Sequence, residues 1–378
     1  MKGEANNQEG VSWSASFSRR SSAGAKPAFA SLSRKLVTSI SAAAIAKNMI
    51  LAGDVGGSKS NIALFNESAD QPARPLNQKS FPSKQYESLD VIVRDYLAEH
   101  PADIQFACFG IAGPVVGARV ETPNLAWVVD GDSLTRTISG ARVDLINDLE
   151  ATAYGIEGLK EDQLYTLNEG DQMRTGSRAL IAAGTGLGIA AIFWDGQRYR
   201  PIASEGGHMD FAPRNEPEID LLRYLNQKFS EHVSCERVLS GPGLFNIYSF
   251  LRDTKRAEEP DWLAAEIASG DRTAAVSMAA LAGKSELAVR ALDLFVEIYG
   301  AIAGNLALLL KSVGGLYIGG GIAPKIIEKL KDGAFMRTFK DKGRMSSLVA
   351  SIPVHVILDD KTALYGAARC AFNNRADK

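Results

Sequence analysis

The chain has 378 residues, of which 46% are hydrophobic, and a formal net charge of −2 from 42 basic and 44 acidic residues. This length predicts two or three domains, and the near-neutral charge gives no electrostatic reason to expect a nucleic acid or an anionic membrane as partner. Cys108, Cys235 and Cys370 form no CxxC pair, which argues against a disulfide framework or a zinc site and fits a reducing cytosol. No uninterrupted apolar run reaches the ~20 residues of a membrane helix.

The N-terminal segment differs in composition from the rest. Residues 11 to 48 contain no Asp or Glu and six Lys or Arg, and they are rich in Ser and Ala. Transit peptides have this composition, but so do disordered tails and sequence translated from an upstream start, and Met49 immediately precedes the first predicted strand. We expect residues 1–48 to be a disordered extension of a cytoplasmic protein, with organellar targeting as the alternative.

The first folded stretch, residues 50 to 65, has two apolar runs around Asp54-Val55-Gly56-Gly57-Ser58. This pattern predicts a β-hairpin. Glycines allow positive φ in the turn and leave no side chain over it, so a phosphate could approach the N–H groups of Gly56, Gly57 and Ser58. Asp54, at the strand end, could hold Mg²⁺ directly or through water. On this stretch alone, an ordinary hairpin is an equally good interpretation.

Residues 178 to 194 repeat the shape, with Gly184-Thr185-Gly186-Leu187-Gly188 as the turn. A dinucleotide fingerprint needs a helix after its glycines, whereas residues 189 to 194 resemble a strand that ends in the hairpin signal Asp195-Gly196. Two such hairpins in successive parts of a chain indicate two related domains facing each other. We expect the phosphates of ATP to lie between them.

Apolar spacing places the other elements that we predict. Strands are expected at 76–81, 104–110, 142–146 and 352–358, and helices at 88–97, 285–313 and 363–372 and from 218 and 324 onward. Within helix 285–313, the small residues at 300, 301, 303 and 304 permit close packing against a neighbour.

Asn147 and Asp148 stand where strand 142–146 ends and a helix begins. Ligands of α/β sheets gather at the carboxyl ends of strands, which makes Asp148 a candidate catalytic residue. Aspartate is also a preferred helix N-cap. The two roles conflict if the carboxylate must face a substrate.

Glu205 and His208 flank two glycines, so both side chains can converge on a small ligand. A carboxylate accepts hydrogen bonds from sugar hydroxyls, and an imidazole can donate or accept them. One histidine and one glutamate make a weak metal site.

Two further candidates have plain structural alternatives. Glu236 precedes Arg237, and the two could form a surface ion pair. Asn124 could bind a sugar hydroxyl above Trp127, or it could be a proline-turn residue beside a core tryptophan.

Together the motifs resemble the bacterial-type glucokinase family, within the sugar kinase, actin and heat-shock chaperone ATPase superfamily. The resemblance spans roughly residues 49 to 372, and it rests on the order of motifs that are individually weak. The motifs are Asp54-Val55-Gly56-Gly57-Ser58, Leu145-Ile146-Asn147-Asp148, Gly184-Thr185-Gly186-Leu187-Gly188, the segment 205–213, the segment 236–243, and Gly319-Gly320-Gly321-Ile322, which is similar to the adenosine motif.

The resemblance implies an α/β, two-domain actin-like (ribonuclease H-like) ATPase fold that binds sugar and ATP in the interdomain cleft. The implied domains are 49–157, completed by 359–378, and 158–358. The implied reaction is transfer of the ATP γ-phosphate to the 6-hydroxyl of glucose, with Mg²⁺, in a homodimer that closes on its sugar.

The resemblance also implies the roles of individual residues. Asp148 would be the general base and a substrate ligand, and Asp54 would hold Mg²⁺. The other sugar ligands would be Asn147, Glu205, His208, Glu236 and, more weakly, Asn124. The ATP-binding residues would be Asp54, Gly56, Gly57, Ser58, Gly184, Thr185, Gly186, Gly319, Gly320 and Gly321.

The chain departs from the family pattern in several places. Ser58 stands where many relatives have Thr, Asn61 stands where some have Arg, and the leader has no counterpart in compact members. A cysteine-rich zinc segment and a helix-turn-helix pattern are absent from the sequence, which argues against a repressor-type relative. Two alternatives stay open: a non-catalytic sugar sensor, or a kinase of the same fold for another hexose or with polyphosphate as donor.

Overall fold

The computed structural model describes residues 46–66, 75–122, 125–171, 175–230 and 232–375. Most of the predicted extension 1–48 and the candidate Asn124 therefore lie outside the described residues. Among the described residues, the first strand begins at Ala46 rather than at the predicted Ile50.

The first sheet has the strand order β3-β2-β1-β4-β8. Its centre is the predicted first hairpin, in which β1 and β2 pair antiparallel. β4 runs parallel to β1, and β8 runs parallel to β4. The carboxyl ends of β1, β4 and β8 therefore meet at one edge, which carries Asp54 and Asn147. The strands are β1 (Ala46–Val55), β2 (Lys59–Asn66), β3 (Asn77–Pro82), β4 (Ala102–Ile111) and β8 (Arg142–Asn147).

The second sheet repeats this arrangement, with the order β12-β11-β10-β13-β14-β9. β10 and β11 form the predicted second hairpin, and β13 and β14 follow in parallel. The sequence did not predict the outer strands β9 and β12. The strands are β9 (Leu164–Asn168), β10 (Arg178–Ala183), β11 (Leu187–Trp194), β12 (Tyr199–Ser204), β13 (Leu316–Gly319) and β14 (Val354–Ile357). A small third sheet contains β5 (Val115–Val116), β6 (Arg119–Glu121) and β7 (Val128–Asp130).

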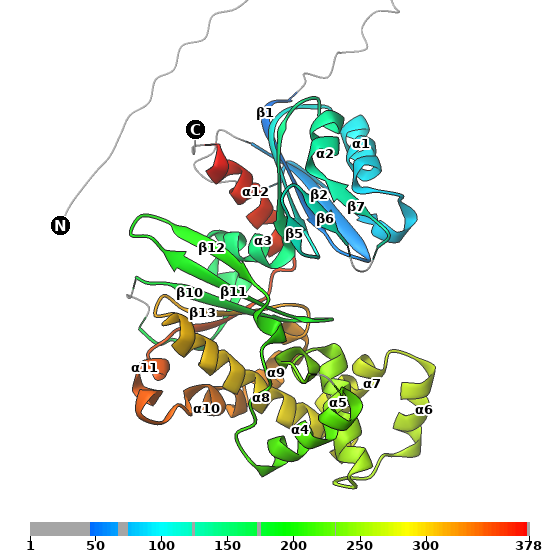
Figure 1. Cartoon of the computed structure of the whole chain (residues 1–378), viewed down its shortest axis with the longest axis vertical. Coiled ribbons are helices and arrows are strands. Elements are labelled where there is room, and N and C mark those ends of the chain that lie inside the picture. The colour runs from blue at the N-terminus through cyan, green and yellow to red at the C-terminus, as the bar shows by residue number, and fades with distance from the viewer. Residues whose placement is uncertain (1–45, 67–74, 123–124, 172–174, 231, 376–378) are drawn as a thin grey trace, which may run out of the picture. The chain divides into compact units, whose positions relative to one another are not determined.

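Helices cover both faces of the first sheet (Figure 1). One buried cluster lies under α1 and α2, and a separate one lies between the sheet and α12. The helices are α1 (Leu89–Glu99), α2 (Gly131–Thr137), α3 (Asp148–Gly155) and α12 (Thr362–Asn374).

The C-terminal helix α12 returns to the first sheet and crosses α3 at unusually short range. A Cβ at Gly366 would lie 1.7 Å from the carbonyl oxygen of Ala151, and one at Gly155 would lie 2.1 Å from that of Thr362. Only glycine allows this approach. The predicted domain boundaries, 49–157 with 359–378 for one domain and 158–358 for the other, stay a prediction.

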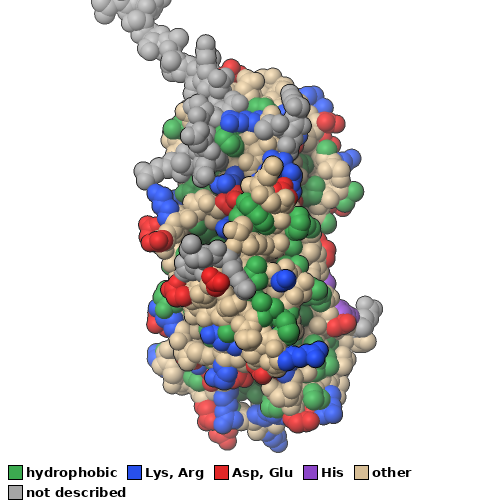
Figure 2. Space-filling model, turned by 90° about the vertical axis from the view of Figure 1, so that its left-hand side faces the viewer, with side chains coloured by type: hydrophobic (Ala, Val, Ile, Leu, Met, Phe, Trp, Pro, Cys, Tyr) green, Lys and Arg blue, Asp and Glu red, His purple; other side chains and the backbone are tan. Residues whose placement is uncertain are grey.

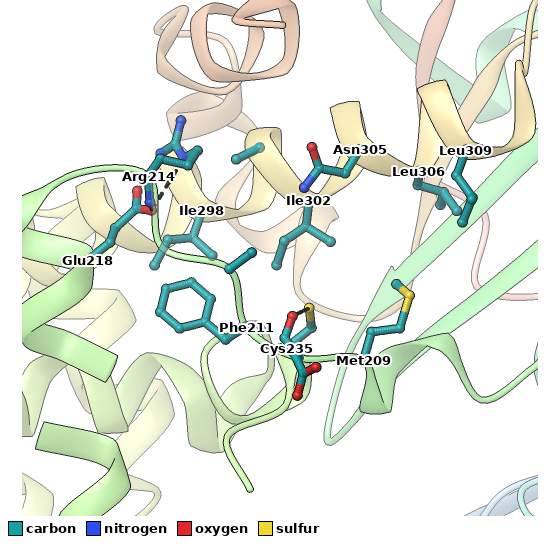
Figure 3. Close-up of a pocket in the computed structure, with 13 residues that line it drawn as sticks. Met209, Phe211, Arg214, Glu218, Cys235, Ile298, Ile302, Asn305, Leu306 and Leu309 are labelled. Atoms are coloured by element: carbon teal, nitrogen blue, oxygen red, sulfur yellow. Dashed lines mark hydrogen bonds and ion pairs between the residues drawn. The ribbon is translucent and has the colours of Figure 1, made fainter. Parts of the chain in front are cut away.

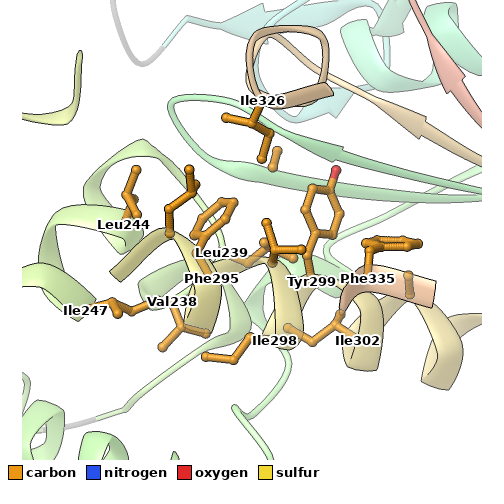
Figure 4. Close-up of a cluster of buried hydrophobic side chains, with 14 of the residues drawn as sticks. Val238, Leu239, Leu244, Ile247, Phe295, Ile298, Tyr299, Ile302, Ile326 and Phe335 are labelled. Carbon is orange, nitrogen blue, oxygen red and sulfur yellow. The ribbon is translucent and has the colours of Figure 1, made fainter. Parts of the chain in front are cut away.

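The remaining helices form a layer on one face of the second sheet, while α3 lies against its other face (Figure 1). They are α4 (Glu216–Lys228), α5 (Gly241–Asp253), α6 (Asp261–Ser269), α7 (Arg272–Leu281), α8 (Glu286–Leu310), α9 (Ile327–Leu330), α10 (Ala334–Lys340) and α11 (Ser346–Ala350). Figure 4 shows their common core, in which Phe295, Ile298 and Tyr299 of α8 lie among side chains of α5 and α10.

Helix α8 is the centre of this layer. The small residues predicted to allow close packing do so against α10, because Cβ atoms at Gly300 and Gly304 would lie 2.2 and 2.4 Å from the carbonyl oxygens of Phe335 and Phe339. By length and composition α8 could also cross a membrane, alone among the helices of the described residues. Its most apolar window is 67% buried inside the fold, as a core helix is.

Basic and acidic side chains are interspersed on the face of the molecule shown in Figure 2. This agrees with the near-neutral net charge. That face shows no single-sign patch that would attract a polyanion.

Candidate active site

The carboxyl-end loops of both sheets open onto one cavity of about 760 Å³. It brings together most of the predicted site residues: Asp54, Gly57, Asn147, Asp148, Gly184, Thr185, Gly186, Glu205, His208, Glu236 and Gly320. Gly56, Ser58, Gly319 and Gly321 are neighbours of lining residues but do not line it, and Asn124 lies outside the described residues. Segments that are far apart in the sequence therefore meet here.

Asn147, not Asp148, is the N-cap of α3. Its Oδ1 accepts the N–H of Leu149 at 2.9 Å, and its amide nitrogen donates to the carbonyl of Gly113 at 3.1 Å. Asp148 is the first helical residue, and its Oδ1 also accepts the Leu149 N–H at 2.9 Å. The conflict between capping and catalysis is thus resolved, because Asn147 caps the helix and the second oxygen of Asp148 is free of that bond.

Two carboxylates of the cavity have perturbed pKa values. Burial raises the pKa of Asp148, and the negative charge of Glu205 raises it further. Burial also raises the pKa of Asp54 to about 6, with Asp148 contributing in the same direction, while a 3.2 Å hydrogen bond from Asn61 opposes it. Both carboxylates thus lie where added positive charge would be stabilising.

Glu205 and His208 reach the cavity because the two glycines between them fit against β11. A Cβ at Gly207 would lie 1.9 Å from the carbonyl oxygen of Leu187, and one at Gly206 would lie 3.1 Å from the side chain of Ile189. Residues 206–208 form a single 3₁₀ turn, closed by the His208 N–H donating to the Glu205 carbonyl at 3.0 Å. Both flanking side chains are exposed and line the cavity.

Glu236 forms no surface ion pair with Arg237. Its Oε2 accepts the N–H of Leu187 at 2.9 Å, across the turn of the second hairpin. A Cβ at Gly186 would lie 2.5 Å from this oxygen, so the glycine admits the carboxylate. Glu236 therefore joins the glutamate and histidine side of the cavity to the second hairpin.

The first hairpin turn differs from our expectation in one respect. Neither Gly56 nor Gly57 has a positive φ, so the turn does not use the backbone freedom that its glycines allow. The turn closes through the Gly56 N–H donating to the Lys59 carbonyl at 3.0 Å, and Ser83 holds it from β3's end by donating its hydroxyl to the Gly56 carbonyl at 2.7 Å. A Cβ at Gly56 would lie 3.2 Å from the Lys59 oxygen, which explains the glycine by close approach.

The second turn is held by α5 and by the adenosine-type motif. The Gly241 N–H donates to the Gly184 carbonyl at 2.8 Å. Gly320 has φ +82°, and a Cβ there would lie 2.3 Å from the Ala183 carbonyl oxygen. Here a glycine is required both by backbone conformation and by space.

The sequence did not predict two polar residues that line the cavity, and it left the role of Trp127 open. Thr152 lies one turn after Asp148 on α3 and lines the cavity, a position that helical spacing could have indicated. Ser204, at the end of β12, also lines it. Trp127 is a core residue that donates its indole N–H to the Tyr86 carbonyl, as the structural alternative held.

A second cavity, of about 270 Å³, lies apart from this site between α8 and the segment that follows His208. Figure 3 shows Met209 and Phe211 facing Ile302 and Leu306 across it, with Arg214 paired to the buried Glu218 at one end. Its lining is mostly apolar. It lacks the convergent polar groups that distinguish the larger cavity.

The donor set of the larger cavity fits Mg²⁺ carried by phosphates. No group of three or more His, Cys, Asp or Glu that could enclose a metal occurs among the described residues. Mg²⁺ commonly uses one or two carboxylates together with water and substrate phosphates. Asp54 offers such a carboxylate, and its raised pKa marks a place where a cation relieves an electrostatic cost.

Comparisons with known proteins agree with this arrangement. Residues 51–374 match the family model for glucokinase. A glucokinase of Synechocystis sp. is 44% identical over 344 residues, covering 85% of this chain and 97% of that protein, and one of Nostoc sp. is 42% identical over 337 residues, covering 85% and 98%. The crystal structure of a glucokinase from an Antarctic psychrotroph has a TM-score of 0.76 at 31% identity, covering 86% of this chain and 99% of that one.

The repeated sheets, the two glycine hairpins and the shared cavity define a sugar kinase of the actin-like two-domain class, as the sequence predicted. The chain belongs to the glucokinase family.

Proposed function

We propose that this protein is a glucokinase that transfers the γ-phosphate of ATP to the 6-hydroxyl of glucose, giving ADP and glucose 6-phosphate, the starting ester of glycolysis. The observation that carries the proposal is the single cavity that joins Asp148, Glu205, His208 and Glu236 to both glycine hairpins. The identity of 42 to 44% to glucokinases over 85% of the chain supports the choice of sugar.

Asp148 is the general base of this reaction. The Leu149 N–H fixes one carboxylate oxygen at 2.9 Å and leaves the other for the sugar hydroxyl. Its raised pKa makes it a stronger base than an exposed aspartate. In a loose phosphoryl-transfer transition state the hydroxyl proton leaves late, so a positioned carboxylate is sufficient.

Four side chains recognise the remaining sugar hydroxyls. Glu205 and Glu236 accept hydrogen bonds, His208 donates or accepts, and Asn147 has one amide hydrogen left after its bond to Gly113. Such a site selects its sugar because, once the bound sugar has displaced water, an analogue that lacks a hydroxyl leaves a polar group unpaired, at about 1–3 kcal/mol.

The two hairpin turns hold the phosphates of ATP through backbone N–H groups. Gly57 supplies the first turn and Gly184, Thr185 and Gly186 supply the second, and all four line the cavity. Gly320 borders the same cavity and is the contact toward adenosine. Mg²⁺, held through Asp54, would neutralise phosphate charge when it is bound.

The test is a coupled assay of the full chain with Mg-ATP and glucose, run beside mannose, fructose and N-acetylglucosamine and beside polyphosphate as donor. We expect kcat/KM to be highest for glucose with Mg-ATP, and turnover to stop when EDTA removes the metal. Folded protein that makes no glucose 6-phosphate would exclude the proposal, and preference for another pair would reassign substrate or donor.

We also propose a cytoplasmic homodimer. Two exposed apolar side chains, Met209 at 42% and Leu309 at 71%, lie at the cavity of Figure 3 and support self-association. Light scattering of the purified chain tests the dimer, since a monomer mass at micromolar concentration contradicts it. Imaging of residues 1–48 fused to a fluorescent protein tests the location, and organellar accumulation would contradict a cytoplasmic one.

A further inference from the structure

A third cavity, of about 290 Å³, adjoins the active site and gathers three cationic side chains from different elements. Lys228 ends α4, Arg237 ends a 3₁₀ turn at Cys235–Arg237, and Arg272 begins α7. The cavity shares Thr185 and Glu236 with the active-site cavity and otherwise has its own lining. It therefore opens beside the second hairpin and shares part of one wall with the cavity that the two hairpins border.

The positive charge of this cavity is not neutralised by its own walls. Glu236 is the one carboxylate among the described lining residues, and its Oε2 accepts the Leu187 N–H. Burial lowers the pKa of Lys228, and the positive charges of Arg272 and Arg237 lower it further despite Asp253. The two guanidinium groups thus disfavour the charged form of Lys228, and an anion between the three cations would relieve that cost.

The cations are also held in place before any ligand arrives. Asn246, which is 5% exposed, accepts from Lys228 Nζ at 2.8 Å and donates to the Arg237 carbonyl at 2.8 Å. The guanidinium of Arg237 lies 4.2 Å from the centre of the Phe229 ring, and that of Arg272 lies 4.9 Å from the Phe245 ring. Preorganised groups of this kind bind with a smaller entropy cost.

We propose that this cavity binds a phosphate group, free or as the monoester of a small organic molecule, at a site separate from that of the ATP phosphates. Two guanidinium groups can each form paired hydrogen bonds with phosphate oxygens, and Lys228 adds a point charge. The Phe229 and Phe245 rings supply apolar walls for an organic part. This inference does not depend on which sugar the enzyme phosphorylates.

Calorimetric titration of the full chain tests the site, with glucose and Mg-ADP saturating the active site. The probes are inorganic phosphate and glycerol 3-phosphate, which is neither substrate nor product. We expect binding to the wild type and a loss of affinity of about tenfold or more in Lys228→Gln and in Arg272→Gln. Glutamine at 228 can still donate to Asn246, so the wall of the cavity is kept. Arg94→Gln, an exposed change on α1, is the matched control and should bind as the wild type does.

The two probes separate the possible ligands. Tighter binding of glycerol 3-phosphate assigns the site to monoesters, and equal binding assigns it to free phosphate. The proposal is overturned by no binding of either probe, by equal affinity in all four proteins, or by binding that Mg-ADP abolishes, since the phosphate would then occupy the nucleotide site. Glucose phosphorylation by each variant is measured in parallel, so failure of the kinase assignment is seen separately.

Discussion

The two hairpin turns have the same proposed role but are held in different ways. The β1–β2 turn is held by neutral side chains of its own sheet and of the turn that follows β3. Ser83 bonds to the Gly56 carbonyl and to the Ser60 hydroxyl, and Asn61 bonds to both Asp54 and Ser80. The β10–β11 turn has no carboxylate of its own. It is held from outside, by Glu236 at Leu187 and by the start of α5 at Gly184.

The two turns therefore do different things: the first places a carboxylate beside Asp148, and the second is joined to the predicted sugar site. The first hairpin brings a half-buried carboxylate, Asp54, toward Asp148, and both have raised pKa values. On this side of the cavity the ionised carboxylates are destabilised, and a bound metal ion or substrate would stabilise them. The second hairpin is bonded to a predicted sugar ligand, so its geometry and that of the sugar site depend on each other. Variants on the two sides of the cavity should therefore differ in what they change.

Asp148→Asn should have the largest effect. It keeps the acceptor for the Leu149 N–H but removes the base, so kcat should fall by about 10³-fold, within the usual range for a general base. The dissociation constant of glucose, measured by tryptophan fluorescence or calorimetry, should change little. In the wild type, kcat/KM should fall as pH decreases through the raised pKa of Asp148, because the protonated carboxyl accepts no proton. Turnover of the variant equal to the wild type would reject Asp148 as the base.

Asp54→Asn should stabilise the metal-free protein while weakening use of Mg-ATP. Because the pKa of Asp54 is raised from 3.8 to about 6, its ionised form destabilises the folded state. This free-energy cost is absent below pH 3.8, grows between pH 3.8 and about 6, and has its full size above that. The shift corresponds to about 3 kcal/mol at neutral pH. Denaturant unfolding in EDTA should therefore show a more stable variant at neutral pH, and a smaller gain at acidic pH.

The control for this prediction is Asp103→Asn, an exposed change on β4. It should alter neither stability nor the KM of Mg-ATP. A variant at Asp54 that is no more stable than the wild type at any pH would show that Asp54 is not held in a costly ionised state.

Sequence alone predicted many of the residues that line the larger cavity, because glycine spacing carries geometric information. The pair Gly206-Gly207 predicted the convergence of Glu205 and His208, since only a turn without side chains can lie against the Leu187 carbonyl. The hairpins were recognised because apolar runs around glycine turns are local patterns. The outer strand β12, which reads Tyr-Arg-Pro-Ile-Ala-Ser, has no such alternation and was not predicted.

What sequence could not supply depends on contacts between distant segments. Asn147 and Asp148 are both good capping residues, and the bond of Asn147 to Gly113, 34 positions away, helps to hold it as the cap. Glu236 appeared to be an ion-pair partner of Arg237 because its bond to Leu187 spans 49 positions. The cavity around Lys228 and Arg272 likewise exists only after α4 and α7 have packed.

Gly207→Ala tests the sugar side of the comparison. Its Cβ would overlap the Leu187 carbonyl, at 1.9 Å, so the 205–208 turn must move away from β11. Overpacking of this kind usually costs about 1–3 kcal/mol, and we expect the KM of glucose to rise by about tenfold or more. Gly158→Ala is the control, because its Cβ would have no neighbour within 4 Å. If both variants have the wild-type KM, the turn does not position Glu205 and His208 for the sugar.

Replacement of Glu236 by Gln and by Ala should give the smallest and most discriminating effects. Glutamine keeps an oxygen that can accept the Leu187 N–H, so it should raise mainly the KM of glucose, because a charged acceptor becomes neutral at a cost of about 1–2 kcal/mol. Alanine also releases the second hairpin, so it should raise the KM of ATP as well. Initial-rate kinetics with both substrates varied would distinguish the two. If both variants change the KM of glucose alone, Glu236 binds the sugar but does not connect it to the second hairpin, and the two turns do not differ in their dependence on the sugar site.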